Sequence, residues 1–89
     1  MARINDIFHL DPSPAEDGYV TVDYTGPRLL RYQVEVKCGG NVKQYNMPDR
    51  YLNIPLNMGK GQYVFTLIER INEKRSKRLA TIVHKFEAN

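Results

Sequence analysis

The sequence predicts an all-β protein that folds as an antiparallel β-sandwich of about seven strands. Apolar and polar residues alternate over several short segments, and this period of two is typical of strands with one buried face. Glycine and proline residues separate the segments, which marks turns between them. Tyr is the commonest aromatic residue, with six copies against three Phe and no Trp. Tyrosine suits half-buried strand faces, because its ring packs while its hydroxyl reaches the rim.

The chain is expected to form one domain, residues 1–89, with an irregular start and a regular core over residues 19–89. The apolar spacing in residues 4–10 suits one helical turn or an irregular strand, and we predict a weak first strand there. Two prolines and a glycine among acidic residues exclude regular structure from residues 11–18. The core of the sandwich is therefore expected to follow this loop.

A short strand is predicted from Tyr19 to Tyr24, and Gly26 and Pro27 end it. The next segment, from Leu30 to Cys38, shows the clearest alternation of apolar and polar residues. Its apolar face is expected to hold Leu30, Tyr32, Val34, Val36 and Cys38. No helix has this period of two. A tight turn at residues 39–41 then leads into a strand over residues 42–47, which predicts an antiparallel hairpin.

The stretch from Pro55 to Glu69 is the most informative part of the sequence for predicting the fold. A short strand over residues 51–56 ends near Pro55, which confines it to an edge or to its own end. The turn at residues 59–61 leads into residues 62–71, where both faces are apolar, so we predict a central strand. After a polar turn, residues 78–86 are expected to form the last strand, with Leu79, Thr81 and Val83 on one face.

The segments after residue 30 resemble a known family. The matching runs are Tyr32-Gln-Val-Glu-Val-Lys-Cys-Gly-Gly, Gln44-Tyr-Asn-Met, and Ile54-Pro-Leu-Asn-Met-Gly-Lys-Gly-Gln-Tyr-Val-Phe. They resemble the small immunoglobulin-like or fibronectin-III-like domains of Gram-positive bacteria and their phages, some of which precede transglutaminase-like domains. The resemblance covers about two thirds of the chain and implies an immunoglobulin-like sandwich that binds surfaces. Because no residue follows Asn89, we carry over no transglutaminase activity and expect a standalone module.

Size and composition disfavour an enzyme. A domain of 89 residues buries only about 60–65% of the surface of its unfolded chain, so we expect no deep catalytic cleft. The single cysteine, Cys38, forms no intrachain disulfide, and packing must supply the stability. The N-terminus has no apolar run typical of a signal peptide or membrane anchor. We therefore expect synthesis in the cytoplasm and no membrane insertion. If the protein works outside the cell, we expect it to leave by lysis, by a specialised route or as part of a particle such as a virion.

No residue pattern predicts catalysis, a metal site or a cofactor. Cys38 and His84 are far apart in sequence, so a core thiol and a rim histidine are favoured over a nucleophilic dyad. One Cys and two distant His do not supply a zinc site. Asp11, Glu16 and Asp17 lack the spacing of a calcium loop and are interpreted as a solvated acidic segment.

The positive charge is concentrated in the last third of the chain. Residues 1–59 carry six Lys and Arg against seven Asp and Glu, a net charge of −1, whereas residues 60–89 carry seven against three, a net charge of +4. The predicted hairpin holds Arg70, Lys74, Arg75, Lys77 and Arg78. This cluster can be a solvated turn, a site for an acidic protein surface, or a site for nucleic acid.

Two tyrosines, Tyr45 and Tyr51, are a second candidate for partner binding if both are exposed, because tyrosine is enriched at protein interfaces. Tyr32 and Tyr63 share faces with aliphatic residues and are expected in the core.

Three functions remain open. The first is a non-enzymatic binding or structural module, such as a phage virion or accessory protein that attaches to capsid or tail proteins or to a cell surface. The second is a small basic nucleic-acid-binding or regulatory protein that uses the hairpin at residues 70–78. The third is an inhibitor of a host enzyme that uses the loop at residues 11–18.

Overall fold

The computed structural model describes residues 7–10, 18–59 and 61–86. Within these ranges the chain forms strands and no helix, which confirms the all-β prediction. The strands are β1 (Phe8–Leu10), β2 (Tyr19–Tyr24), β3 (Tyr32–Cys38), β4 (Asn41–Met47), β5 (Tyr51–Pro55), β6 (Gly61–Arg70) and β7 (Ser76–Phe86). The predicted first strand over residues 4–10 is described only from residue 7, and the predicted loop at residues 11–17 lies outside the described residues.

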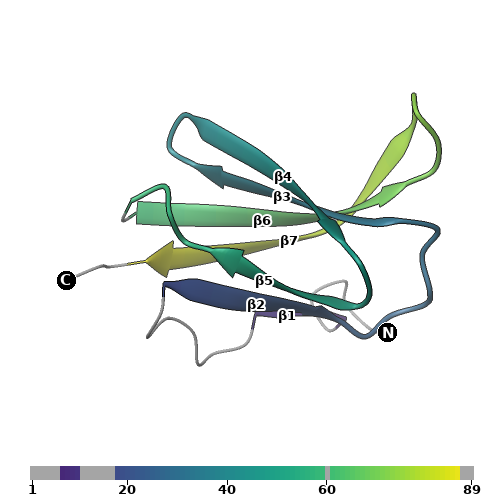
Figure 1. Ribbon diagram of the computed structural model, residues 1–89, viewed down its shortest axis with the longest axis horizontal. Coiled ribbons are helices and arrows are strands. Elements are labelled where there is room, and N and C mark those ends of the chain that lie inside the picture. The colour runs from purple at the N-terminus through teal and green to yellow at the C-terminus, as the bar shows by residue number, and fades with distance from the viewer. Residues whose placement is uncertain (1–6, 11–17, 60, 87–89) are drawn as a thin grey trace.

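The strands form two antiparallel sheets packed as a sandwich. The smaller sheet has the order β1-β2-β5, and the larger sheet has the order β4-β3-β6-β7. Figure 1 shows the smaller sheet as the lower layer and β4, β3 and β6 above it. This order corresponds to strands A, B and E packed against strands C′, C, F and G of an immunoglobulin-like sandwich.

Strand β6 is the centre of the larger sheet, as its apolar faces predict. It pairs with β3 from Tyr63 opposite Cys38 to Glu69 opposite Tyr32, and with β7 on its other side. Thr66 and Ile68 on its outer face are buried as well as the residues on its inner face. A strand with neighbours on both sides has all its backbone hydrogen bonds within the sheet, which suits burial on both faces.

The core lies between the two sheets and draws on both. Alternate residues of each strand point inward, as the period of two requires. The smaller sheet contributes Phe8, Val20, Val22, Tyr24 and Ile54, and the larger sheet contributes Tyr32, Val34, Val36, Cys38, Met47, Tyr63, Phe65, Leu67 and Ala80. The predicted burial of Tyr32, Tyr63 and Cys38 is therefore confirmed.

Leu30 does not lie on the buried face of β3, so that prediction is wrong. Strand β3 begins at Tyr32, and Leu30 is 73% exposed. The hydroxyl of Tyr24 donates to the carbonyl of Pro27 at 2.6 Å, and the hydroxyl of Tyr32 accepts from the N–H of Leu29 at 3.2 Å. Because these tyrosines bind the backbone of the β2–β3 connection, the connection leaves the sheet before Arg31 and Leu30 does not follow the alternation of β3.

Leu79 also departs from the predicted pattern. It was expected to share one face of the last strand with Thr81 and Val83, but it packs against the core while those two side chains are exposed. A register shift between Leu67 and Ile68 leaves Leu79 as an extra residue on β7, a β-bulge. The bulge turns Leu79 inward beside Ala80, which a strict period of two does not predict.

The hydroxyl of Tyr63 fixes the turn before β6. It donates to the carbonyl of Gly59 at 2.5 Å and accepts from the N–H of Met58 at 3.0 Å. Burial raises the pKa of the Tyr63 hydroxyl above its ordinary value of 10.0, so the group stays protonated and can donate at neutral pH. A buried tyrosine near the start of strand F that bonds the backbone a few residues upstream is the tyrosine corner of immunoglobulin-like sandwiches.

A second buried tyrosine organises the opposite end of the sandwich. The guanidinium of Arg50 lies 5.7 Å from the centre of the Tyr24 ring and donates to the carbonyl of Gly26 at 2.5 Å. A Cβ atom at Gly26 would lie 2.6 Å from the hydroxyl oxygen of Tyr24 and 2.8 Å from the Cδ1 atom of Ile7. Only glycine therefore fits at this position without moving the tyrosine.

Gly26→Ala is expected to destabilise the protein by about 1–3 kcal/mol, because the added methyl overpacks a buried ring. The free energy of unfolding in urea measures the effect. Gly40→Ala is the matched control, since a Cβ atom there meets nothing within 4 Å, and its effect is expected within about 0.5 kcal/mol. Equal effects of the two substitutions would contradict the packing account of Gly26.

Candidate functional site

Three connections meet at one end of the sandwich, at the right of Figure 1. They are the β2–β3 connection at residues 25–31, the β4–β5 connection at residues 48–50, and the β6–β7 hairpin at residues 71–75. Loops held at one end of a rigid sandwich are a usual place for binding residues. We call this region the hairpin end.

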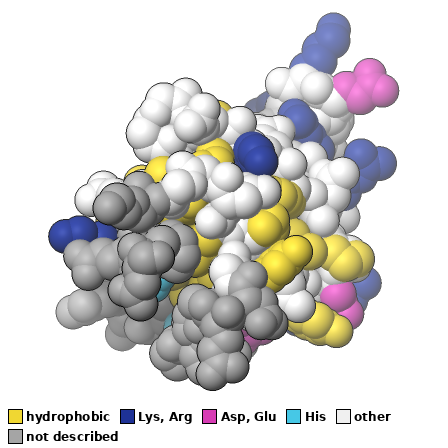
Figure 2. All heavy atoms as spheres, turned by 60° about the vertical axis from the view of Figure 1, so that its left-hand side comes forward, with side chains coloured by type: hydrophobic (Ala, Val, Ile, Leu, Met, Phe, Trp, Pro, Cys, Tyr) yellow, Lys and Arg dark blue, Asp and Glu magenta, His cyan; other side chains and the backbone are white. Residues whose placement is uncertain are grey.

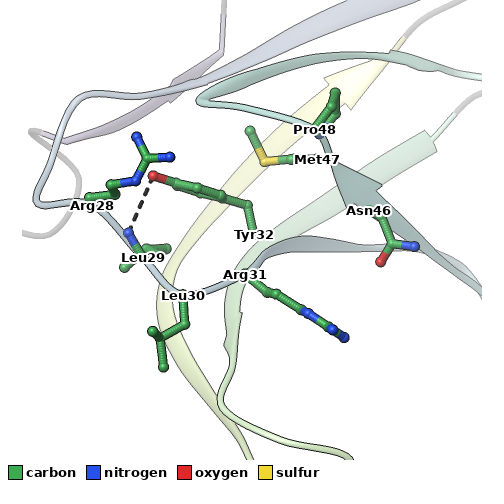
Figure 3. Close-up of a pocket in the computed structure, with 8 residues that line it drawn as sticks. All are labelled: Arg28, Leu29, Leu30, Arg31, Tyr32, Asn46, Met47 and Pro48. Carbon is green, nitrogen blue, oxygen red and sulfur yellow. Dashed lines mark hydrogen bonds between the residues drawn. The ribbon is translucent and has the colours of Figure 1, made fainter.

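Two shallow depressions adjoin at the hairpin end. The first has a volume of about 400 Å³ and is lined by Arg28, Leu29, Leu30, Arg31, Tyr32, Asn46, Met47 and Pro48 (Figure 3). The second has a volume of about 320 Å³ and is lined by Leu30, Arg31, Arg70, Ile71, Asn72 and Glu73. Both are lined by Leu30 and Arg31, so the two form one continuous surface.

Two large aliphatic side chains are exposed on this surface. Leu30 is 73% exposed and Ile71 is 42% exposed. The N–H of Leu30 donates to the carboxylate of Glu69 at 3.0 Å, which ties the exposed leucine to the end of β6. Exposed aliphatic side chains are stabilised when a partner buries them. Patches of such side chains therefore often mark interaction sites.

Arg31 and Arg70 lie directly opposite each other across β3 and β6. The N–H of Arg70 donates to the carbonyl of Arg31 at 3.1 Å, which continues the β3–β6 pairing one residue past Tyr32 and Glu69. Figure 3 shows Arg31 and Tyr32 pointing to opposite sides of the chain, so Arg31 lies away from the core. Two positive charges therefore share the outer side of the sheet.

The residues of the predicted basic cluster do not lie together. Figure 2 shows Lys and Arg side chains along the projecting hairpin. Lys74 and Arg75 are at its tip, where their N–H groups donate to the side-chain oxygen of Asn72 at 2.8 and 2.9 Å. Lys77 pairs with Glu69 in the β6–β7 register, and Arg70 lines the second depression.

Arg78 is engaged on the outer sheet face. Its guanidinium lies 3.2 Å from a carboxylate oxygen of Glu35, and the ammonium of Lys37 lies 3.9 Å from the same oxygen. Glu35 is only 7% exposed, although it stands on the polar face of β3. Arg78 thus compensates a buried carboxylate and is not available to a partner in the same way as the hairpin residues.

The tyrosine candidates are separated. Tyr45 is half-buried on β4 and packs against the core, whereas Tyr51 is 62% exposed at the start of β5. The two strands belong to different sheets. Tyr51 remains a candidate for partner contact, and Tyr45 offers only the part of its ring that stays exposed.

The residues considered for catalysis do not meet. Cys38 and His84 both pair with Tyr63, from opposite sides of β6, so two strand spacings separate them. The thiol of Cys38 is buried and lies 3.8 Å from the carbonyl of Met58. Asp11, Glu16 and Asp17 lie outside the described residues. Among the residues that the structure describes, no three His, Cys, Asp or Glu side chains group to hold a metal ion.

Arg28, Leu30 and Arg31 were not identified as functional candidates from the sequence. The available signal was two arginines around adjacent leucines, directly after a Gly-Pro turn. This signal was overlooked because the period-two pattern assigned Leu30 to the buried face of the strand, so Leu30 was not considered as a surface residue.

Comparison of the chain with protein-family models, curated proteins and solved structures finds no match. No helix in the described part of the chain is long and apolar enough to cross a membrane.

Arg78→Gln is expected to lower the free energy of unfolding by about 1 kcal/mol, because it leaves the buried Glu35 carboxylate with a weaker partner. Urea denaturation measures the loss. Lys77→Gln is the control and is expected to change stability by less than about 0.5 kcal/mol. Adding Glu35→Gln to Arg78→Gln is expected to recover part of the loss, since it removes the buried charge. No recovery would contradict this account.

Proposed function

We propose that the protein is a non-enzymatic binding module that attaches through its hairpin end to a larger protein assembly. The observation that supports this most directly is the pair of exposed aliphatic side chains, Leu30 and Ile71, in adjoining depressions surrounded by arginines. Aliphatic contact area flanked by arginine is typical of protein interfaces, where a buried apolar centre is bordered by polar groups.

The sandwich supplies a rigid support for this surface. Tyr24 and Tyr32 hold the β2–β3 connection by their hydroxyl groups, and their rings pack edge to face with centres 5.8 Å apart. The hairpin is closed by backbone bonds from the N–H groups of Ile71 and Asn72 to the carbonyl of Arg75. A surface that is ordered before binding loses less conformational entropy on association.

The assembly that fits best is a symmetric particle, with a phage virion as the specific proposal. The resemblance of the segments after residue 30 to sandwich domains of Gram-positive bacteria and their phages supports it, together with the small size of the binding surface. Many copies on a symmetric lattice make weak individual contacts effective.

Nucleic-acid binding is a second candidate, and the positive charge of residues 60–89 favours it. The composition of the hairpin end favours a protein instead. Single-stranded nucleic acid binds aromatic side chains on which bases stack, but the aromatic residue that lines the depressions, Tyr32, is buried. Inhibition of a host enzyme through residues 11–18 involves a segment that lies largely outside the described residues.

A photocrosslinking amino acid at Leu30 tests the proposal in the cells or phage lysate that produce the protein. The expected result is one discrete adduct, identified by mass spectrometry as a subunit of a multimeric assembly. The matched control carries the same amino acid at Gln62, which is exposed at the opposite end of β6, and is expected to give no such adduct.

No adduct at Leu30, or the same adducts from both positions, would contradict attachment through the hairpin end. Absence of the protein from purified particles would exclude the virion form of the proposal and leave other assemblies.

A further inference from the structure

The pair Arg31 and Arg70 is unfavourable for folding alone. Like charges directly opposite each other on neighbouring strands are destabilising. The backbone hydrogen bond between the two residues fixes them in this position, so the chain cannot separate them by a small shift. A negatively charged partner would relieve the repulsion between the two charges.

Among the described residues, no carboxylate forms an ion pair with either arginine, although Glu73 lines the same depression. Within the described ranges, the ion pairs are those of Glu35 with Lys37 and with Arg78. Glu69 follows the alternation to the other side of β6 from Arg70, and its carboxylate accepts from the N–H of Leu30. The two guanidinium groups are therefore open to an anion from a partner.

Arginine is suited to bind carboxylates, because its planar guanidinium matches both oxygens in a bidentate contact. Leu30 lies next to Arg31 in sequence, and Ile71 lies next to Arg70, and all four residues line the second depression. Each arginine thus has an exposed aliphatic neighbour. This arrangement matches a segment in which acidic and aliphatic side chains alternate.

We propose that the hairpin end binds an acidic–aliphatic segment of its protein partner, with carboxylates on Arg31 and Arg70 and apolar side chains on Leu30 and Ile71. This inference rests on the proposed function and adds the chemistry of the partner. A polynucleotide is a poorer fit, since a continuous phosphate chain gains nothing from the two aliphatic side chains.

The test is an NMR titration of the full chain with a short synthetic peptide that alternates Asp or Glu with Leu. The amide signals of Leu30, Arg31 and Ile71 are expected to shift. Arg31→Gln and Arg70→Gln are each expected to weaken binding about tenfold. Arg75→Gln is the matched control, because it removes the same charge from the same hairpin but lines neither depression, and it is expected to weaken binding less than about twofold.

A second peptide, with Asn and Gln in place of Asp and Glu, separates charge from apolar contact and is expected to bind more weakly. The inference is overturned if the acidic peptide does not bind, if the amide peptide binds equally well, or if Arg75→Gln matches Arg31→Gln. It is also overturned if a single-stranded DNA oligonucleotide at the same salt concentration binds more tightly than the acidic peptide.

Failure of this inference is distinguishable from failure of the proposed function. An adduct at Leu30 without any effect of Arg31→Gln would keep the hairpin end as the binding surface and remove the acidic partner. The spectrum of each free variant shows whether it has folded, so loss of binding is scored only for variants whose remaining signals match those of the unaltered protein.

Discussion

The pairing of β3 with β6 is the interaction on which the rest of the structure depends. It joins two strands whose inner faces supply seven of the 15 buried core residues, and it runs from Cys38 opposite Tyr63 to Tyr32 opposite Glu69. One residue further, the same pairing brings Arg31 opposite Arg70. The core and the candidate binding surface are thus two parts of a single register. A shift of one residue would expose the apolar face of β3 and also separate the two arginines.

Tyrosine hydroxyls connect this paired centre to the two ends of the sandwich. Tyr63 holds the turn that enters β6, while Tyr24 and Tyr32 hold the connection that enters β3. Each ring is buried in the core and each hydroxyl binds backbone outside a strand, so packing of the core also orders the loops. The exposed Leu30 is a consequence, because the connection that carries it is held outside the sheet. Stability and surface presentation are therefore coupled through a few side chains.

Much of the fold could be predicted from the sequence, because burial alternates with a period of two and glycine or proline ends most segments. Strand β6 illustrates this, since its apolar residues on both faces identified a central strand. The extra residue Leu79 could not be predicted, because a bulge depends on how two strands pair and not on either strand alone. The candidate site was predicted only in part for the same reason. The basic hairpin is visible in the sequence, but the engagement of Arg78 by Glu35 and the opposition of Arg31 and Arg70 depend on register between distant segments.

The central claim is that the hairpin end keeps a repulsive arginine pair for binding at some expense of stability. The most direct measurement is the free energy of unfolding of Arg31→Glu in urea at low salt, compared with the unaltered protein. The account predicts an increase of about 0.5 kcal/mol, because a cross-strand ion pair with Arg70 replaces the repulsion. It also predicts that Arg31→Glu adds no stability when Arg70 is already replaced by Gln, with the single variant Arg70→Gln as the reference. Lower stability of Arg31→Glu, or an equal gain in the Arg70→Gln background, would contradict the account.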